Sequence, residues 1–94
     1  MKLKIFGVSM QVKRRKHLRT KEEAMGIYYP GQNLIHIDAD LKGEEYDQCV
    51  LHEAVHALLD RLHISPAIDE DVEEIIADSV ATMITENWKL SKKR

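Results

Sequence analysis

The residues most able to do chemistry form the segment His52-Glu53-Ala54-Val55-His56. Two histidines four residues apart lie on one face of an α-helix, about 40° from each other and one turn apart. At that spacing two imidazole nitrogens can reach one zinc ion at about 2.0–2.1 Å. Glu53 is offset by about 100°, where its carboxylate can hold and deprotonate a zinc-bound water. If the segment is helical, it predicts half of a hydrolytic zinc site.

A third ligand would distinguish a metal site from a chance pattern on a surface helix. His63 lies seven residues past His56 and is one candidate. The three-histidine pattern of some zinc peptidases, however, needs a glycine where Leu59 stands and a histidine where Leu62 stands. We therefore interpret His63 as a polar residue near the end of a helix.

The second candidate is Glu74, which lies four residues before Asp78 and so shares a helix face with it. Ala77 and Ala81 flank that face, and their small side chains would let this helix approach the histidines closely. In that arrangement Glu74 completes a site of two histidines and one glutamate. Asp78 can then accept a hydrogen bond from the far nitrogen of a ligating histidine. Glu73 stays open as an alternative ligand, or as an acid favoured by the helix dipole.

Two helices are predicted to carry these side chains. Apolar residues at helical spacing predict one helix from about Glu44 to Arg61, which ends before His63–Pro66. A second helix is predicted from about Asp69 to Trp88, with Trp88 packed at its end. Its apolar stripe consists of Val72, Ile76, Val80, Met83 and Ile84.

A small sheet is predicted before the helices. Leu3–Val12 alternates loosely and reads as one strand, and the polar, basic residues after it read as the exposed end of that strand and a connection. Gly26–Tyr29 and Leu34–Asp38 read as two strands of a hairpin, joined by turn residues 30–33. We therefore predict an α+β fold with a small, mostly antiparallel sheet of about three strands packed on the two helices.

Length and composition bound the class of protein. The 94 residues allow a single domain, spanning 1–94, whose small core a bound metal would stabilise. The net charge of −2 argues against a protein that mainly coats nucleic acid or an anionic membrane. We interpret the basic residues Lys13, Arg14, Arg15, Lys16 and Arg19 as a solvated loop. The single cysteine, Cys49, and the lack of a long apolar stretch lead us to expect a cytoplasmic protein.

The pattern His52-Glu53-x-x-His56, followed by Glu74-x-x-x-Asp78 on a later helix, resembles the gluzincin clan of metallopeptidases. The sequence Glu74-x-x-Ala77-x-x-x-Ala81 is similar to the helix after the active-site helix in ImmA/IrrE-type peptidases of phages and mobile elements. The short length and the hairpin before the first long helix resemble the minigluzincins. The resemblance covers about residues 24–88. It departs from the ImmA/IrrE-type pattern in having Asp78 in place of asparagine and Val80 in place of phenylalanine.

The resemblance implies a minimal zincin-like domain and a zinc-dependent hydrolase of peptide bonds. By carry-over, His52, His56 and Glu74 would bind Zn²⁺, Glu53 would be the general base, and Asp78 would orient a histidine. The partner would be a peptide or protein substrate, added as a strand to the sheet edge nearest the metal. We expect Asn33–Asp38 to form that edge.

Several points stay open. A donor to the developing oxyanion could be any of Tyr28, Tyr29, Tyr46, His36 and His63. The C-terminal Trp88–Arg94 could lie across the cleft and leave a latent enzyme. The alternative function is a zinc-stabilised interaction module of phage or mobile-element origin without peptidase activity. The sequence defines neither the natural substrate nor the oligomeric state.

Overall fold

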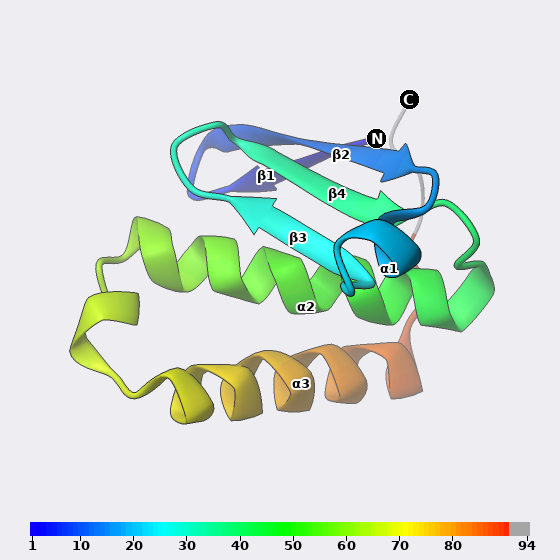
Figure 1. The fold of residues 1–94 in the computed structure, drawn as a ribbon. Coiled ribbons are helices and arrows are strands. Elements are labelled where there is room, and N and C mark those ends of the chain that lie inside the picture. Colours follow the sequence, from blue (N-terminus) through cyan, green and yellow to red (C-terminus); the bar gives the residue numbers. More distant parts are fainter. Residues whose placement is uncertain (91–94) are drawn as a thin grey trace.

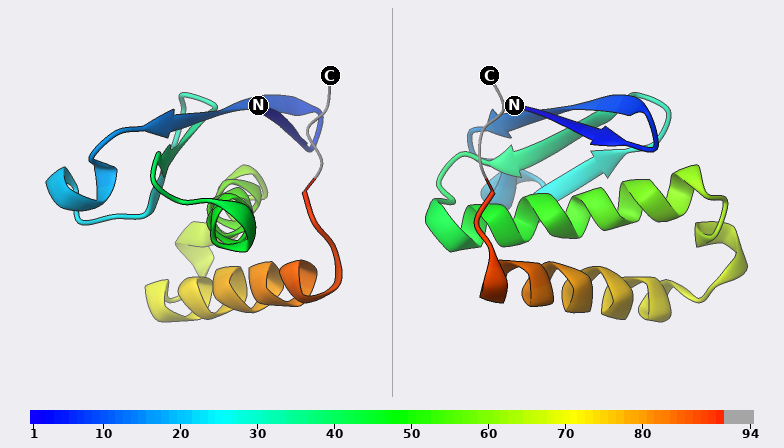
Figure 2. Two further views of the ribbon diagram at one scale, coloured as in Figure 1. Left: turned by 90° about the vertical axis from the view of Figure 1, so that its right-hand side faces the viewer. Right: turned by 180° about the vertical axis from the view of Figure 1, so that it is seen from behind.

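The computed structural model describes residues 1–90 and arranges them as a sheet, a long central helix and a second long helix (Figure 1). The elements in chain order are β1 (Lys2–Ile5), β2 (Val8–Arg15), α1 (Leu18–Lys21), β3 (Gly26–Tyr29), β4 (Leu34–Asp38), α2 (Gly43–Arg61), a short 3-10 helix η1 (Ser65–Ala67) and α3 (Glu70–Asn87). Seen end-on, α2 lies between the sheet and α3 (Figure 2). The predicted α+β class and both long helices are confirmed. Of the segment Trp88–Arg94, which is predicted as a possible cover of the cleft, residues 91–94 lie outside the described residues.

The sheet has four strands in the order β1-β2-β4-β3, not the three we predicted. The single strand predicted over Leu3–Val12 is wrong, because Phe6 and Gly7 form a turn that separates β1 from β2. Both residues have positive φ angles, 49° and 79°, as a type I′ hairpin turn requires. The β1–β2 and β3–β4 pairs are antiparallel, and β2 pairs with β4 in parallel. The sheet is therefore mixed, and the predicted β3–β4 hairpin is confirmed.

The edge strand beside the helices is β3. We expected Asn33–Asp38 to form that edge, and this is wrong because β4 pairs with β3 on one side and with β2 on the other. Ile35 and Ile37 of β4 are fully buried, so the most apolar strand occupies the interior of the sheet. The sheet edge that is free to pair near the histidines is therefore Gly26–Tyr29.

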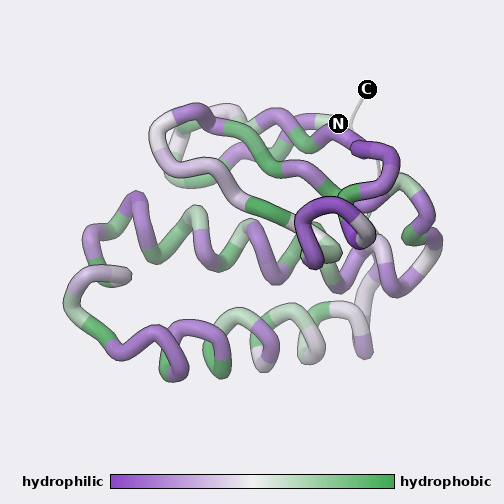
Figure 3. Tube along the Cα trace, in the orientation of Figure 1, coloured by the Kyte–Doolittle hydropathy of each residue, from purple (hydrophilic) through white to green (hydrophobic). Residues whose placement is uncertain are grey.

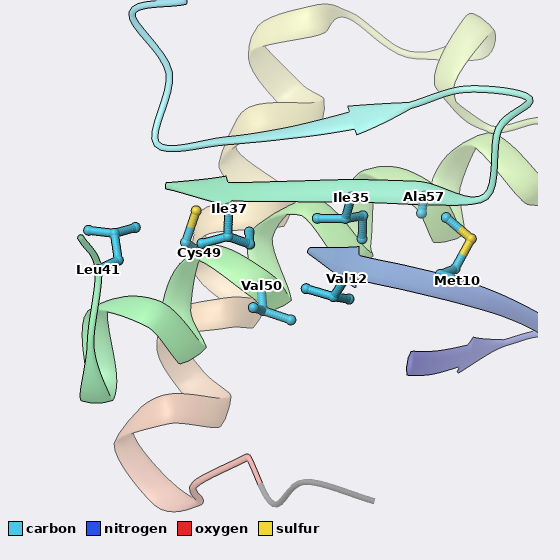
Figure 4. Packing of buried hydrophobic residues seen from close by; sticks show 8 residues of the cluster. All are labelled: Met10, Val12, Ile35, Ile37, Leu41, Cys49, Val50 and Ala57. Atoms are coloured by element: carbon cyan, nitrogen blue, oxygen red, sulfur yellow. The ribbon is translucent and has the colours of Figure 1, made fainter. Parts of the chain in front are cut away.

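The core has two parts, one on each side of α2. Between α2 and the sheet, one cluster contains Met10, Val12, Ile35, Ile37, Leu41, Cys49, Val50 and Ala57 (Figure 4). Between α2 and α3, a smaller cluster contains Val55, Leu59 and Ala77. Ala77 and Ala81 are fully buried, so small side chains do let α3 approach α2 as predicted. This close approach brings the carboxylates of α3 to the histidines of α2.

The apolar stripe predicted on α3 is only partly buried. Ile76 and Val80 pack against the smaller cluster, but Val72 is 44% and Met83 is 54% exposed. Trp88 is 64% exposed, so the prediction that it packs at the end of the helix is wrong. The physical reason is that the surface of α3 that meets α2 is formed by Ala77 with Ile76 and Val80, while Val72 and Met83 lie outside this contact. Figure 3 shows hydrophobic and hydrophilic residues alternating along both long helices.

Within residues 1–90, no helix combines the length and the apolar character needed to cross a membrane.

Candidate metal centre

The two histidines of α2 are directed toward α3. Their Nε2 atoms lie 3.2 Å apart, and both side chains are largely buried. The helix that presents them is continuous from Gly43 to Arg61, so the predicted one-turn spacing of His52 and His56 is present. Two imidazole nitrogens therefore face one small volume between the helices.

Glu74 of α3 supplies the third group. Its Oε2 lies 3.2 Å from Nε2 of His52, and its Oε1 lies 2.9 Å from Nε2 of His56. Donor atoms around a tetrahedral ion at about 2.0–2.1 Å lie about 3.3–3.4 Å from one another. Because the three groups offer atoms at nearly this spacing, His52, His56 and Glu74 could hold a metal ion.

The outer nitrogen of each histidine contacts a carboxylate of α3. Nδ1 of His52 lies 2.6 Å from Oδ1 of Asp78, and Nδ1 of His56 lies 2.5 Å from Oε2 of Glu73. An N–H donated to a carboxylate fixes the imidazole tautomer and leaves Nε2 with its lone pair free for a metal. The structure thus places Asp78 where the sequence predicted a partner for a histidine.

The contact of Glu73 with His56 is not among the sequence predictions, in which Glu73 is either an alternative ligand or an acid favoured by the helix dipole. A signal for it exists, because Glu73, Ala77 and Ala81 are spaced four residues apart and so share one helix face. The two alanines are buried against α2, which places Glu73 on the same side. Its hydrogen bonds with His56 and Ser65 lower the pKa of Glu73, although burial opposes this shift.

We call His52, His56 and Glu74 together the metal group. Glu53 lies beside it and is 9% exposed. Its Oε2 is 4.0 Å from Nε2 of His52. Burial raises the pKa of the Glu53 carboxyl, while the charges of His52 and His56 and a backbone hydrogen bond from Tyr28 act in the opposite direction. A carboxylate with a raised pKa next to a metal group is suited to accept and return a proton.

Gly26 allows the edge strand β3 to pass close to Glu53. A Cβ atom added at Gly26 would lie 2.6 Å from Sγ of Cys49 and 3.0 Å from Cγ of Glu53. Cys49 is buried, and burial raises the pKa of its thiol to about 12, so it is a packing residue and not a thiolate. Glycine at position 26 therefore sets the distance between the sheet edge and the carboxylate.

Replacing Gly26 by alanine is expected to lower the free energy of unfolding by about 1–3 kcal/mol, because the new methyl group overpacks a buried contact. Urea unfolding measures this loss. Cys49→Ala removes the closest atom, the sulfur. Adding Gly26→Ala to Cys49→Ala should therefore cost less free energy of unfolding than adding it to the wild type. A Gly26→Ala protein as stable as the wild type would contradict the close packing.

Two hollows adjoin the metal group, and Glu53 and Glu74 line both. One, of about 430 Å³, extends past His56 and is also lined by Tyr28, Asp60 and Glu70. The other, of about 610 Å³, extends past His52 and is also lined by Met25, Gly26 and Asp78. The three candidate ligands thus lie between two open spaces.

The five candidates for an oxyanion donor lie in different places. Tyr28 lines the first hollow, and its hydroxyl donates to Oδ2 of Asp60 at 2.6 Å. Burial and Asp60 raise the pKa of Tyr28 to about 12, so its hydroxyl keeps its proton. Tyr29 and His36 contact each other on the face of the sheet that is turned away from α2. Tyr46 lies under the Arg14 guanidinium. His63 is exposed after the end of α2. Of the five candidates, Tyr28 is therefore the one that lines a hollow together with His56 and Glu74.

Removing the carboxylate of Asp78 tests the role of the outer contacts. Asp78→Ala should weaken zinc affinity by about 10–100-fold, because His52 loses the partner that orients its ring. Competition with a coloured chelator measures the affinity. Glu86→Ala, which removes an exposed acid elsewhere on α3, is the control and should bind zinc as the wild type does. Equal affinities of all three proteins would show that Asp78 does not orient His52.

Comparisons with protein-family models, curated proteins and solved structures found no match to this chain. The resemblance to gluzincins therefore stays a prediction, and function is inferred from the geometry around His52, His56 and Glu74.

Proposed function

We propose that the protein is a zinc-dependent peptidase of the gluzincin type, built on a minimal zincin-like domain, with His52, His56 and Glu74 as zinc ligands. One observation carries the proposal. Two histidine Nε2 atoms and the Glu74 carboxylate converge at distances between 2.9 and 3.2 Å, while carboxylates hold both Nδ1 atoms. Such paired support of each imidazole is typical of metal ligands.

The donor set favours zinc. Two imidazole nitrogens and one carboxylate oxygen are a common protein ligand set of catalytic zinc, which leaves a fourth position for water or substrate. Zinc held there supplies a Lewis acid that lowers the pKa of a bound water toward about 7 and polarises a carbonyl group.

Glu53 supports a catalytic role over a purely structural one. Its carboxylate takes the proton from the attacking water and delivers it to the nitrogen of the leaving amine. Holding a carboxylate in a largely buried position costs free energy of desolvation. A purely structural zinc site does not need such a carboxylate beside its ligands. The position of Glu53 next to His52, with a raised pKa, matches a group that exchanges a proton.

The substrate is an extended peptide that pairs with the edge strand β3. This strand has one free edge, and its Gly26 lies against Glu53. An added strand gains backbone hydrogen bonds along Gly26–Tyr29, independent of its sequence. It would pass from one hollow to the other and bring one peptide group to the metal group between them.

The alternative is a zinc-stabilised interaction module without turnover. It is favoured by the small size of the cluster between α2 and α3, where Val55, Leu59 and Ala77 are the buried residues. A metal held by His52, His56 and Glu74 would join these two helices and add folding free energy.

The experiment that separates the two functions is cleavage of a denatured protein or a peptide library by the zinc-loaded protein, read as new termini by mass spectrometry. The peptidase proposal expects cleavage that a chelator abolishes and added zinc restores. Bound zinc without cleavage would favour the interaction module. A protein that binds no zinc would contradict both.

A further inference from the structure

The positive charges of this protein are concentrated in one part of the chain. Residues 1–21 contain eight lysines and arginines and neither aspartate nor glutamate, and all 16 acids follow them. The overall net charge of −2 therefore averages a basic region and an acidic region. Net charge alone says little about the partners of a protein whose charges are separated in this way.

The basic region forms much of one face of the sheet. The interpretation of Lys13, Arg14 and Arg15 as loop residues is wrong, because all three belong to β2. Met10 and Val12 of β2 are buried toward α2, so the alternation of side chains turns their neighbours the other way. We call this side of the sheet the outer face. Its strand residues are Lys2, Lys4, Ser9, Gln11, Lys13, Arg15, Ile27, Tyr29, Leu34, His36 and Asp38. Within residues 1–90, no helix covers it except α1, which lies at one end (Figure 2).

Two rings lie among these cations. The side chain of Tyr29, on β3, reaches across β4, because its hydroxyl lies 3.3 Å from Nη1 of Arg15 on β2. The same hydroxyl lies 3.2 Å from Nδ1 of His36, and the two ring centroids are 4.9 Å apart. Lys13 is the register partner of His36. Burial and the charges of Arg15 and Lys13 lower the pKa of His36, which favours the neutral form of its ring.

Acids offset little of this charge. In the described part of the chain, Asp38 is the one acidic residue at an outward position of the four strands. It is 1% exposed, and its Oδ2 lies 3.6 Å from Nε of Arg19. Glu22, in the segment after α1, lies 3.7 Å from Arg15. The exposed strand positions of the outer face therefore carry positive charge only.

We infer that the outer face binds single-stranded nucleic acid, with phosphates near Lys2, Lys4, Lys13 and Arg15 and bases against Tyr29 and His36. A flat sheet face that combines cations with rings suits unstacked bases, which offer their faces for stacking. A duplex hides those faces, and an acidic peptide would make no use of the rings. This inference does not depend on the proposed peptidase activity, because the metal group lies between α2 and α3.

The test is fluorescence anisotropy of a labelled oligothymidylate titrated with the full chain. Four phosphate contacts on a single strand predict that affinity falls about 50-fold between about 50 and 200 mM salt. In Lys4→Gln/Lys13→Gln, two contacts remain, and the salt effect should fall to about 7-fold. Tyr29→Leu should weaken binding by about 10-fold, through lost stacking.

The matched control is Lys42→Gln/Lys89→Gln, which removes the same charge from exposed positions outside the outer face. It should bind as the wild type does, and circular dichroism should show all variants folded. The inference is overturned if the wild type does not bind, if the control loses as much affinity as the outer-face variant, or if a duplex competes as well as the single strand. Stronger competition by polyglutamate than by the oligonucleotide would instead assign the outer face to an acidic protein partner.

Discussion

Replacing Glu53 by glutamine should leave zinc bound and reduce peptide hydrolysis by about 10²–10⁴-fold. The two side chains have nearly the same shape, so the packing against Gly26 and the histidine ligands are kept. Glutamine cannot accept the proton of the attacking water, so the chemical step loses its base. Zinc content by mass spectrometry and initial rates on one cleaved peptide measure the two effects together.

The control for this variant is Glu44→Gln, which makes the same change at an exposed position in the first turn of the same helix. It should keep both zinc and activity. A Glu53→Gln protein that cleaves at the wild-type rate would show that Glu53 is not the base. Loss of zinc as well as activity would show instead that Glu53 supports the metal group.

Removing the carboxylate of Glu74 should have the larger effect on metal binding. Glu74→Ala takes away one of three candidate ligands, so zinc affinity should fall by more than the 10–100-fold typical of an outer partner. Glu73→Ala should lie within that smaller range, because Glu73 contacts Nδ1 of His56 and not the shared volume between the Nε2 atoms. Chelator competition measures both affinities.

Thermal unfolding provides a second measurement of the same two variants. Zinc that binds only the folded chain raises its stability by an amount that grows with zinc concentration. The unfolding midpoint should rise with zinc in the wild type and in Glu73→Ala, but very little in Glu74→Ala. Glu70→Ala, which removes an exposed acid from the first turn of α3, is the control. The reverse order of Glu73 and Glu74 would make Glu73 the third ligand.

Helical spacing explains what the sequence could predict about the candidate site. Residues four apart on a helix share a face whatever the rest of the fold does. The pairs His52/His56 and Glu74/Asp78 could therefore be placed from local pattern alone. The small residues Ala77 and Ala81 added the information that the two helices approach closely, and the structure buries both against α2.

The sheet could be predicted less well, because strand order depends on contacts between distant segments. The hairpin of β3 and β4 follows from a local turn, but the parallel pairing of β4 with β2 does not. The sequence predicts three strands because the apolar alternation reads as continuous from Leu3 to Val12 and does not reveal the turn at Phe6–Gly7. The interior position of β4 depends on burial of Ile35 and Ile37 against α2, which is a tertiary effect.

The outer contact of His56 shows a different limit. Glu73 and Glu74 are neighbours in a run of acids at the start of α3, and an acid in that position is favoured by the helix dipole whatever else it does. Only the packing of the two helices distinguishes them. It leaves the side chain of Glu74 51% exposed over both Nε2 atoms and that of Glu73 16% exposed against Nδ1 of His56.

The most direct test of the metal centre is the zinc content of the purified wild-type chain after dialysis against a weak chelator. A site of two imidazoles and a carboxylate, with an outer partner for each ring, should retain about one zinc ion per chain. The same measurement on Glu74→Ala should give a value near zero. A wild-type chain that retains no zinc would contradict the assignment of His52, His56 and Glu74 as a metal centre.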